Sequence, residues 1–295
     1  MIKFIAEIGS NHNNDWNRTE LLIKAAKHAG CYAVKFQYYK AEKLWHPSLK
    51  NNIESAMKSE LPKKFLPKIS KLCKELGIKF ICSVFDLENI SLVSKHVDYL
   101  KIASYEFLWI DLFKECLDSR LPVMISTGLC NEDEILEFGE ELLSYDFYEN
   151  QTLTIFHCVA NYPARAEECN LAVLPEFHKM FFPHNIGWSD HTTEPGVIHK
   201  AVELGAEYIE LHFDIQLPVK TSQNHYAPYS EYEAGNESVY GHCWNSEAVR
   251  TLIKNINIGE HAIGKPDKKP VGDEINNRKF RADPVDGLRL LRRYR

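Results

Sequence analysis

The sequence contains no hydrophobic run long enough to cross a bilayer and no apolar leader at its start. Charged residues already occur at Lys3 and Glu7, whereas a membrane-spanning helix needs about 20 apolar residues and a secretory signal needs an uninterrupted apolar core. We therefore expect a cytoplasmic protein without a membrane partner.

Closely spaced cysteine pairs are also missing. The cysteines lie at positions 31, 73, 82, 116, 130, 158, 169 and 243, and none forms the Cys-x-x-Cys pattern of a zinc or redox motif. In a chain without a leader we expect reduced thiols that mostly fill core positions. Cys158 is of interest because it follows His157 at the predicted end of a strand.

A broad basic surface is the third absence. The formal charge is −6, and the basic cluster of the chain is its end, Arg289 to Arg295. Because neutralising phosphates drives nucleic-acid binding, we expect no nucleic-acid partner. The 44% hydrophobic and 26% charged residues are typical of a globular protein with a sizeable core.

Strand-like apolar runs alternate with amphipathic stretches along most of the chain, which is the pattern of parallel strands joined by helices. The predicted strands are 4–8, 33–37, 79–84, 99–104, 123–127, 153–158, 185–189 and 208–213. The predicted helices include 18–29, 63–76, 132–143, 195–204 and 246–263, and glycines 30, 77 and 205 follow three of them as expected caps.

We predict an α/β fold, a (β/α)8 TIM barrel that forms a single domain over residues 1–264. A long loop, 214–244, would lie over the rim after the last strand, and an irregular C-terminal tail, 265–295, would pack on or near the barrel. Polar residues gather near the carboxyl ends of the predicted strands, which is the rim where barrel enzymes place their chemistry. Buried charges there would cost several kcal/mol each unless they faced one another or a charged ligand.

Two histidines close consecutive strands of this predicted barrel. His191 ends the run from Asn185, and His212 ends the next strand beside Glu210. Neutral imidazoles side by side suit Mn²⁺, Zn²⁺, Fe²⁺ or Co²⁺, with Asp190 or Glu210 orienting a ring. Alternatively, His191 is a hydrogen-bonding group at a helix start and His212 is a satisfied core histidine.

Ammonium and hydroxyl donors collect on the second, fourth, fifth and seventh predicted strands and suit a phosphate or a carboxylate. They are Lys35, Lys101, Ser104, Ser126, Thr127 and Ser189. Alternatively, the lysines pair with Glu7, Glu106 or Glu210 in a structural network. Glu7 is also a candidate proton donor or water activator, whereas Asn11 and His12 are either site residues or ordinary turn and capping residues.

Several segments resemble the sialic acid synthase family, the phosphoenolpyruvate-condensing enzymes that make nonulosonic acids. They follow the family's order over most of the first 213 residues. The matching segments are Ala-Glu-Ile-Gly-Ser-Asn-His (6–12), Val-Lys-Phe-Gln (34–37), Leu-Lys-Ile-Ala-Ser (100–104), Ile-Ser-Thr-Gly (125–128), His-Cys-Val-Ala-Asn-Tyr-Pro (157–163), Gly-Trp-Ser-Asp-His-Thr (187–192) and Glu-Leu-His-Phe (210–213).

The resemblance implies a metal-dependent barrel transferase that condenses phosphoenolpyruvate with an N-acetylated, N-acetylmannosamine-like hexosamine and releases phosphate by C–O cleavage. A divalent ion, Mn²⁺ with Mg²⁺, Co²⁺ or Zn²⁺ as alternatives, would be held by His191 and His212 and would polarise the sugar aldehyde. Glu7 would manage the attacking water or a proton. By position in the motifs, phosphoenolpyruvate would be bound by Lys35, Lys101, Ser104, Ser126 and Ser189, with Gln37, Glu106 and Tyr162 close to the substrates.

Family members usually continue into an antifreeze-like C-terminal domain that reaches over the partner's barrel in a dimer. We expect this chain to lack that domain and to close its sugar pocket differently, through the loop 214–244 with His242 and through segment 278–281, and we expect a homodimer. Two other functions remain open: a phosphoenolpyruvate aldol condensation that gives another 3-deoxy-ulosonic acid, and a non-catalytic sugar-binding barrel.

Overall fold

The computed structural model describes residues 2–145, 147, 151–215 and 243–294. His242 and most of the predicted rim loop lie outside the described residues. The chain divides into two compact units, Met1–Asn257 and Ile258–Arg295. Packing of the predicted tail on the barrel stays a prediction. No helix of the described part of the chain is long and apolar enough to cross a membrane.

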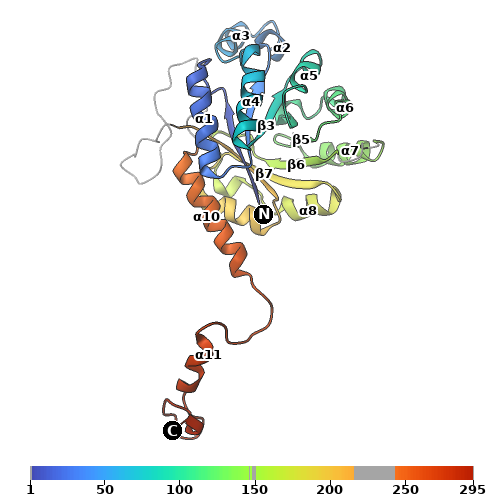
Figure 1. The fold of residues 1–295 in the computed structure, drawn as a ribbon. Coiled ribbons are helices and arrows are strands. Elements are labelled where there is room, and N and C mark those ends of the chain that lie inside the picture. The colour runs from blue at the N-terminus through green and yellow to red at the C-terminus, as the bar shows by residue number, and fades with distance from the viewer. Residues whose placement is uncertain (1, 146, 148–150, 216–242, 295) are drawn as a thin grey trace. The chain divides into compact units, whose positions relative to one another are not determined.

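Parallel strands form a closed barrel in chain order, with the last strand paired back onto the first (Figure 1). They are β1 Lys3–Gly9, β2 Ala33–Tyr38, β3 Lys79–Val84, β4 Tyr99–Ile102, β5 Val123–Ser126, β6 Leu153–Cys158, β7 Asn185–Asp190 and β8 Tyr208–His212. The predicted (β/α)8 barrel is therefore confirmed. Strand β4 ends two residues before its predicted end, because Ser104–Glu106 form a 3₁₀ turn, η2.

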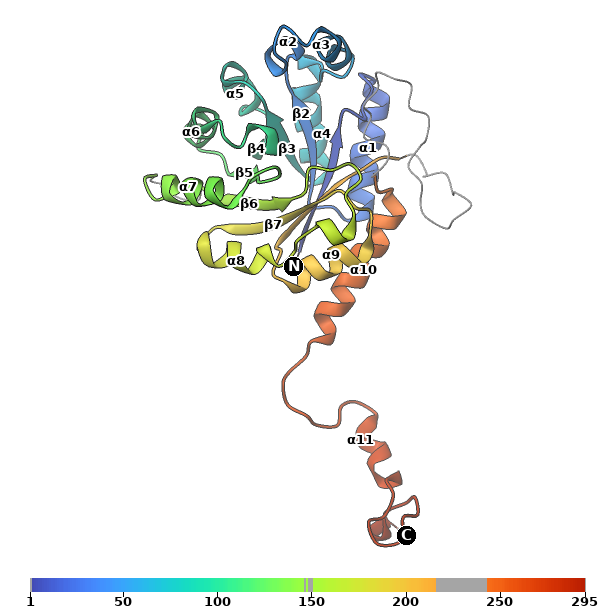
Figure 2. The same ribbon diagram turned by 180° about the vertical axis from the view of Figure 1, so that it is seen from behind.

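Helices α1 to α9 follow the strands and lie around the barrel (Figure 2). Their bounds are α1 Trp16–Ala29, α2 Ala41–Leu44, α3 Lys50–Met57, α4 Leu66–Leu76, α5 Leu87–Val93, α6 Ile110–Asp118, α7 Glu132–Leu142, α8 Val173–Met180 and α9 Pro195–Glu203, and α10 Ser246–Ala262 and α11 Glu274–Asn277 come later in the chain. Gly30, Gly77 and Gly205 have φ values of 92°, 65° and 102°. These left-handed conformations confirm the predicted helix ends, where a side chain would be strained.

The barrel interior is apolar at its middle and closed by tyrosines at its amino end. Phe156 and Tyr208 belong to the buried interior cluster. The hydroxyls of Tyr32 and Tyr99 are 2.5 Å apart, and Lys3 Nζ donates to the Tyr208 hydroxyl at 2.7 Å. The amino end of the interior is therefore filled by side chains.

Residues 243–245 return to the end of β8. Phe213 forms a parallel bridge with Trp244, whose amide donates to the His212 carbonyl at 2.7 Å. Arg18 at the start of α1 pairs with Asp214 at 2.7 Å and donates to the Asn11 carbonyl at 2.5 Å. These contacts fix the backbone around the end of β8 and the loop after β1.

Candidate active site

The parallel register brings charged and polar side chains of neighbouring strands together at the carboxyl rim. Glu7 is paired in register with Lys35 on one side and with His212 on the other. Ser189 is paired with Glu210. Since residues in register on parallel neighbours face the same side, the rim collects these groups inside the barrel mouth. All of them are buried.

Lys35 joins two carboxylates at the centre of this rim. Its Nζ lies 3.0 Å from Glu7 Oε2 and 3.3 Å from Glu210 Oε1. Gln37 Nε2 donates to the other oxygen of Glu7 at 2.7 Å, and the Ser189 hydroxyl donates to Glu210 Oε1 at 3.2 Å. The structural network that we kept as an alternative therefore exists around Lys35, and it leaves Lys101 outside.

The two carboxylates differ in acidity because Lys101 adds its charge to that of Lys35 at Glu210. Burial raises the pKa of Glu7, and the charge of Lys35 offsets only part of that rise. Burial also acts on Glu210, but the charges of Lys35 and Lys101 outweigh it and lower its pKa. Glu7 is thus the carboxyl group of the pair that is better suited to carry a proton.

Lys101 is a buried cation without an ion-pair partner among the described carboxylates. It is 1% exposed, and its Nζ donates to Ser126 Oγ at 2.5 Å and to the Ile102 carbonyl at 3.0 Å. Burial lowers its pKa to about 8. Its Nζ also lies 5.4 Å from the ring centroid of Phe156, just above the apolar interior. An anionic ligand would supply the missing opposite charge.

The two predicted metal-binding histidines lie together, with ring centroids 5.1 Å apart. The Nδ1 of His191 is 2.6 Å from the Val159 carbonyl. Because a carbonyl only accepts, Nδ1 carries the proton and the ring lone pair lies on Nε2. Burial lowers the pKa of His191 to about 4, so the ring is neutral at neutral pH, which is the form that binds metals.

This donor set fits a divalent ion that keeps open coordination positions for water or substrate. Within the described residues, no cluster of three or more His, Cys, Asp or Glu is arranged to hold a metal. The Oε2 atom of Glu210, on the same strand as His212, is buried and accepts no hydrogen bond from a described residue. The ring centroid of Tyr162 lies 4.1 Å from that of His191 and 5.8 Å from that of His212.

Ser104 and Glu106 lie in η2, at the mouth above β4. The Ser104 hydroxyl accepts the Gly128 amide at 3.0 Å, which ties the loop after β5 to this turn. Burial raises the pKa of Glu106 to about 7, and its Oε2 is buried without a hydrogen-bond partner among the described residues. Glu106 therefore has an acceptor available to a hydroxyl or amide of a ligand.

Some polar residues of the predicted rim point elsewhere. Asp190 does not orient His191: its Oδ1 accepts from Trp188 Nε1 at 3.1 Å and from the Thr192 hydroxyl at 2.8 Å. The Thr127 hydroxyl donates to the Phe156 carbonyl at 3.0 Å. It is therefore not one of the hydroxyl donors that face the rim. The prediction placed both in the site because it located strand ends without fixing which face each residue presents.

Asn11 and His12 serve the loop after β1. Asn11 Nδ2 donates to the Phe213 carbonyl at 3.0 Å, and His12 Nδ1 accepts the amide of Asn14 at 3.0 Å. Both contacts support the turn and capping alternative. The backbone groups of Val159 and Gly128 could not be predicted to take part, because almost any residue type supplies a carbonyl and an amide.

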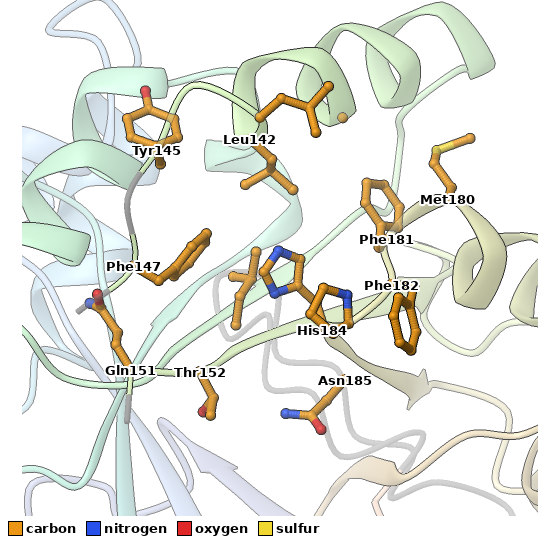
Figure 3. Close-up of a pocket in the computed structure, with 14 residues that line it drawn as sticks. Leu142, Tyr145, Phe147, Gln151, Thr152, Met180, Phe181, Phe182, His184 and Asn185 are labelled. Atoms are coloured by element: carbon orange, nitrogen blue, oxygen red, sulfur yellow. The ribbon is translucent and has the colours of Figure 1, made fainter. Parts of the chain in front are cut away.

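Among the described residues, cavities are also lined by side chains other than the charged groups of this rim. One of about 560 Å³ is lined by Leu153 and Asn185 at the starts of β6 and β7, together with Phe182 and His184 (Figure 3). This cavity therefore lies at the amino ends of the strands, opposite the end that carries His191 and His212. Another, of about 550 Å³, lies beside the start of α9 and includes Arg165.

The closed barrel and the charged groups at its carboxyl rim define a (β/α)8-barrel enzyme. A family model described as the NeuB family matches residues 22–232. The chain belongs to the NeuB family, and it is an enzyme of the sialic acid synthase type, as its sequence motifs predicted.

Named relatives agree with this membership. The N,N'-diacetyllegionaminic acid synthase of Legionella pneumophila is 33% identical over 291 residues, which cover 92% of this chain and 76% of that protein. The N-acetylneuraminic acid synthetase of Leptospira borgpetersenii, solved in complex with citrate, has a TM-score of 0.77 and 25% identity and covers 94% of this chain and 90% of its own. A Bacillus subtilis spore coat polysaccharide biosynthesis protein has a TM-score of 0.73 and 29% identity. The match covers 93% of this chain and 72% of that protein's chain.

Proposed function

We propose that this enzyme condenses phosphoenolpyruvate with an N-acetylated hexosamine, resembling N-acetylmannosamine, to give a nonulosonic acid and phosphate. The observation that carries the proposal is Lys101, a buried ammonium group with no carboxylate partner among the described residues, next to Ser126 and on the same rim as the histidine pair. A buried ammonium group whose charge Glu210 offsets only in part, without forming an ion pair with it, is prepared for an anion. The names of the relatives support a product of the nonulosonic acid class.

Phosphoenolpyruvate would bind over the cationic half of the rim. Lys101 and Lys35 would face its negative charges, and three hydroxyls would donate to its oxygens once they turn from their present partners. These hydroxyls belong to Ser104, Ser126 and Ser189. The two lysines come from different strands, so one would contact the carboxylate of phosphoenolpyruvate and the other its phosphate.

The sugar would bind over the other half of the rim, with His191 and His212 holding a divalent ion. When bound there, such an ion supplies Lewis-acid polarisation of an aldehyde oxygen. Glu106 and Gln37 would contact the hydroxyls or amide of the sugar. Tyr162 is 48% exposed while its ring packs against both imidazoles, so it would form a wall of the sugar pocket.

The reaction would then form a carbon–carbon bond and a carbon–oxygen bond to water, and it would break the carbon–oxygen bond to phosphate. C3 of phosphoenolpyruvate would bond to the aldehyde carbon, whose oxygen takes up a proton. Water would add to C2, with its proton passing to a basic group, and the C2–O bond would break as phosphate leaves. Glu7, whose pKa is raised by burial, is the group that would hold or move the proton.

Phosphate release from phosphoenolpyruvate, measured with Mn²⁺ across N-acetylated hexosamines and their phosphorylated forms, tests this proposal. We expect sugar-dependent release that His212→Ala reduces at least about 100-fold, the range for loss of one transition-state electrostatic contact. His46→Ala, at an exposed histidine, is the matched control and should retain full activity. No release with any acceptor, or full activity in His212→Ala, would refute the proposal.

A further inference from the structure

The segment from the end of β6 to residue 164 surrounds His191 on several sides. The Val159 carbonyl accepts a hydrogen bond from Nδ1 of His191, and the Ala164 amide donates to the backbone carbonyl of His191 at 2.9 Å. The Tyr162 ring covers its face. Cys158 adds a fourth contact, with its sulfur 3.9 Å from Nδ1. This single segment therefore fixes the orientation of the imidazole.

Cys158 also contacts the serines on the other half of the rim. It is paired in register with Ser189 of the neighbouring strand. Burial raises the pKa of its thiol, and the charge of Lys101 and hydrogen bonds from the hydroxyls of Ser104 and Ser189 offset part of that rise. The side chain is buried, with the residue 6% exposed. Cys158 thus touches two proposed phosphoenolpyruvate ligands and one proposed metal ligand.

The hydrogen bonds around Cys158 have a defined direction. The Ser104 oxygen already accepts the Gly128 amide, so its own proton is available to the sulfur. The Ser189 hydroxyl has two acceptors within reach, Glu210 Oε1 at 3.2 Å and the sulfur of Cys158. A thiol is a weak donor and a weak acceptor. It therefore orients both serines while allowing them to turn toward an anion at little cost.

We propose that Cys158 is a positioning residue that sets the two serines and His191 relative to one another, and so prepares both halves of the site. This inference rests on the proposed function, because that function assigns the serines to phosphoenolpyruvate and His191 to the metal. Its mechanism is hydrogen bonding through the thiol rather than the filling of space.

Serine and alanine at position 158 separate these two roles, since both are smaller than cysteine by nearly the same volume and serine alone keeps a donor and an acceptor. The binding of phosphoenolpyruvate and of Mn²⁺ to the full chain would be measured by titration calorimetry, without any sugar. We expect Cys158→Ala to raise both dissociation constants roughly 10-fold, the lower end of the effect of groups that orient metal ligands. Cys158→Ser should stay within about 3-fold of the wild type, since it keeps the hydrogen bonds.

Cys130→Ala is the control for the loss of a thiol from the same rim, because the Cys130 sulfur donates to the Gly128 carbonyl at 3.7 Å. It should leave both dissociation constants unchanged. Equal affinities in Cys158→Ser and Cys158→Ala, or weaker binding in the serine variant, would overturn the inference and leave the proposed function intact. Failure of the wild type to bind phosphoenolpyruvate would overturn the proposed function, and this inference with it.

Discussion

Replacement of Lys101 by methionine should weaken phosphoenolpyruvate binding about 10- to 100-fold without destabilising the protein. Because burial lowers the pKa of Lys101 from 10.5 to about 8, its charge costs the folded state roughly 3 kcal/mol at neutral pH. Methionine removes that cost but also the hydrogen bonds to Ser126 and Ile102, which contribute about 1 to 3 kcal/mol. The free energy of unfolding should therefore stay equal or rise by up to about 2 kcal/mol.

The pH dependence of stability gives this prediction a second signature. A lysine whose pKa is lowered by folding destabilises the folded state fully below the folded pKa, here about 8. The penalty disappears as the pH rises toward the unfolded value of 10.5, because the unfolded state then loses its extra proton. The free energy of unfolding of the wild type should rise over this range relative to that of Lys101→Met.

Urea unfolding of both proteins across this pH range measures the stability, and calorimetry measures phosphoenolpyruvate binding. Loss of one charge-assisted contact of 1.5–3 kcal/mol should weaken binding about 10- to 100-fold. Lys114→Met is the matched control, since Lys114 is exposed and lies 3.3 Å from Glu141; it should change neither quantity. A loss of more than about 2 kcal/mol of stability, or wild-type binding by Lys101→Met, would refute the reasoning.

Three further predictions concern single side chains of the rim. His191→Ala should abolish Mn²⁺ binding in calorimetry, whereas unchanged binding would remove the histidine pair from the metal site. Gly128→Ala would place a Cβ 2.7 Å from Ser104 Oγ; we expect a loss of about 1 to 3 kcal/mol in unfolding free energy and a higher KM for phosphoenolpyruvate, and a KM equal to that of the wild type would contradict this. Burial raises the pKa of Cys158 to about 11, so iodoacetamide should label it, by mass spectrometry, only after unfolding; rapid labelling of the native protein would show that the thiol is not buried as described.

The barrel could be predicted from sequence because its strands are continuous apolar runs separated by amphipathic helices. The run from Leu153 to Cys158 was predicted with both of its observed ends. The prediction extended β4 to Ser104, because an apolar run does not show where a 3₁₀ turn replaces a strand. Periodicity locates an element more securely than it locates the last residue of that element.

The candidate site was predictable where charge itself was the signal. Lys35 and Lys101 are conspicuous in buried strands, and the structure places both at the rim. Asp190 was misplaced because a strand end does not tell which of two successive residues faces the interior. The contribution of Val159 could not be predicted, since it uses a backbone carbonyl brought to His191 by the packing of two strands.

Sugar-dependent phosphate release tests most directly whether the lysines and the histidine pair of the rim act together in one reaction. The measurement compares the wild type, Lys101→Met and His212→Ala with phosphoenolpyruvate, Mn²⁺ and an N-acetylated hexosamine. We expect release by the wild type that needs all three components and falls at least about 10-fold in both variants. Release that is independent of the sugar, or that survives either substitution, would contradict it.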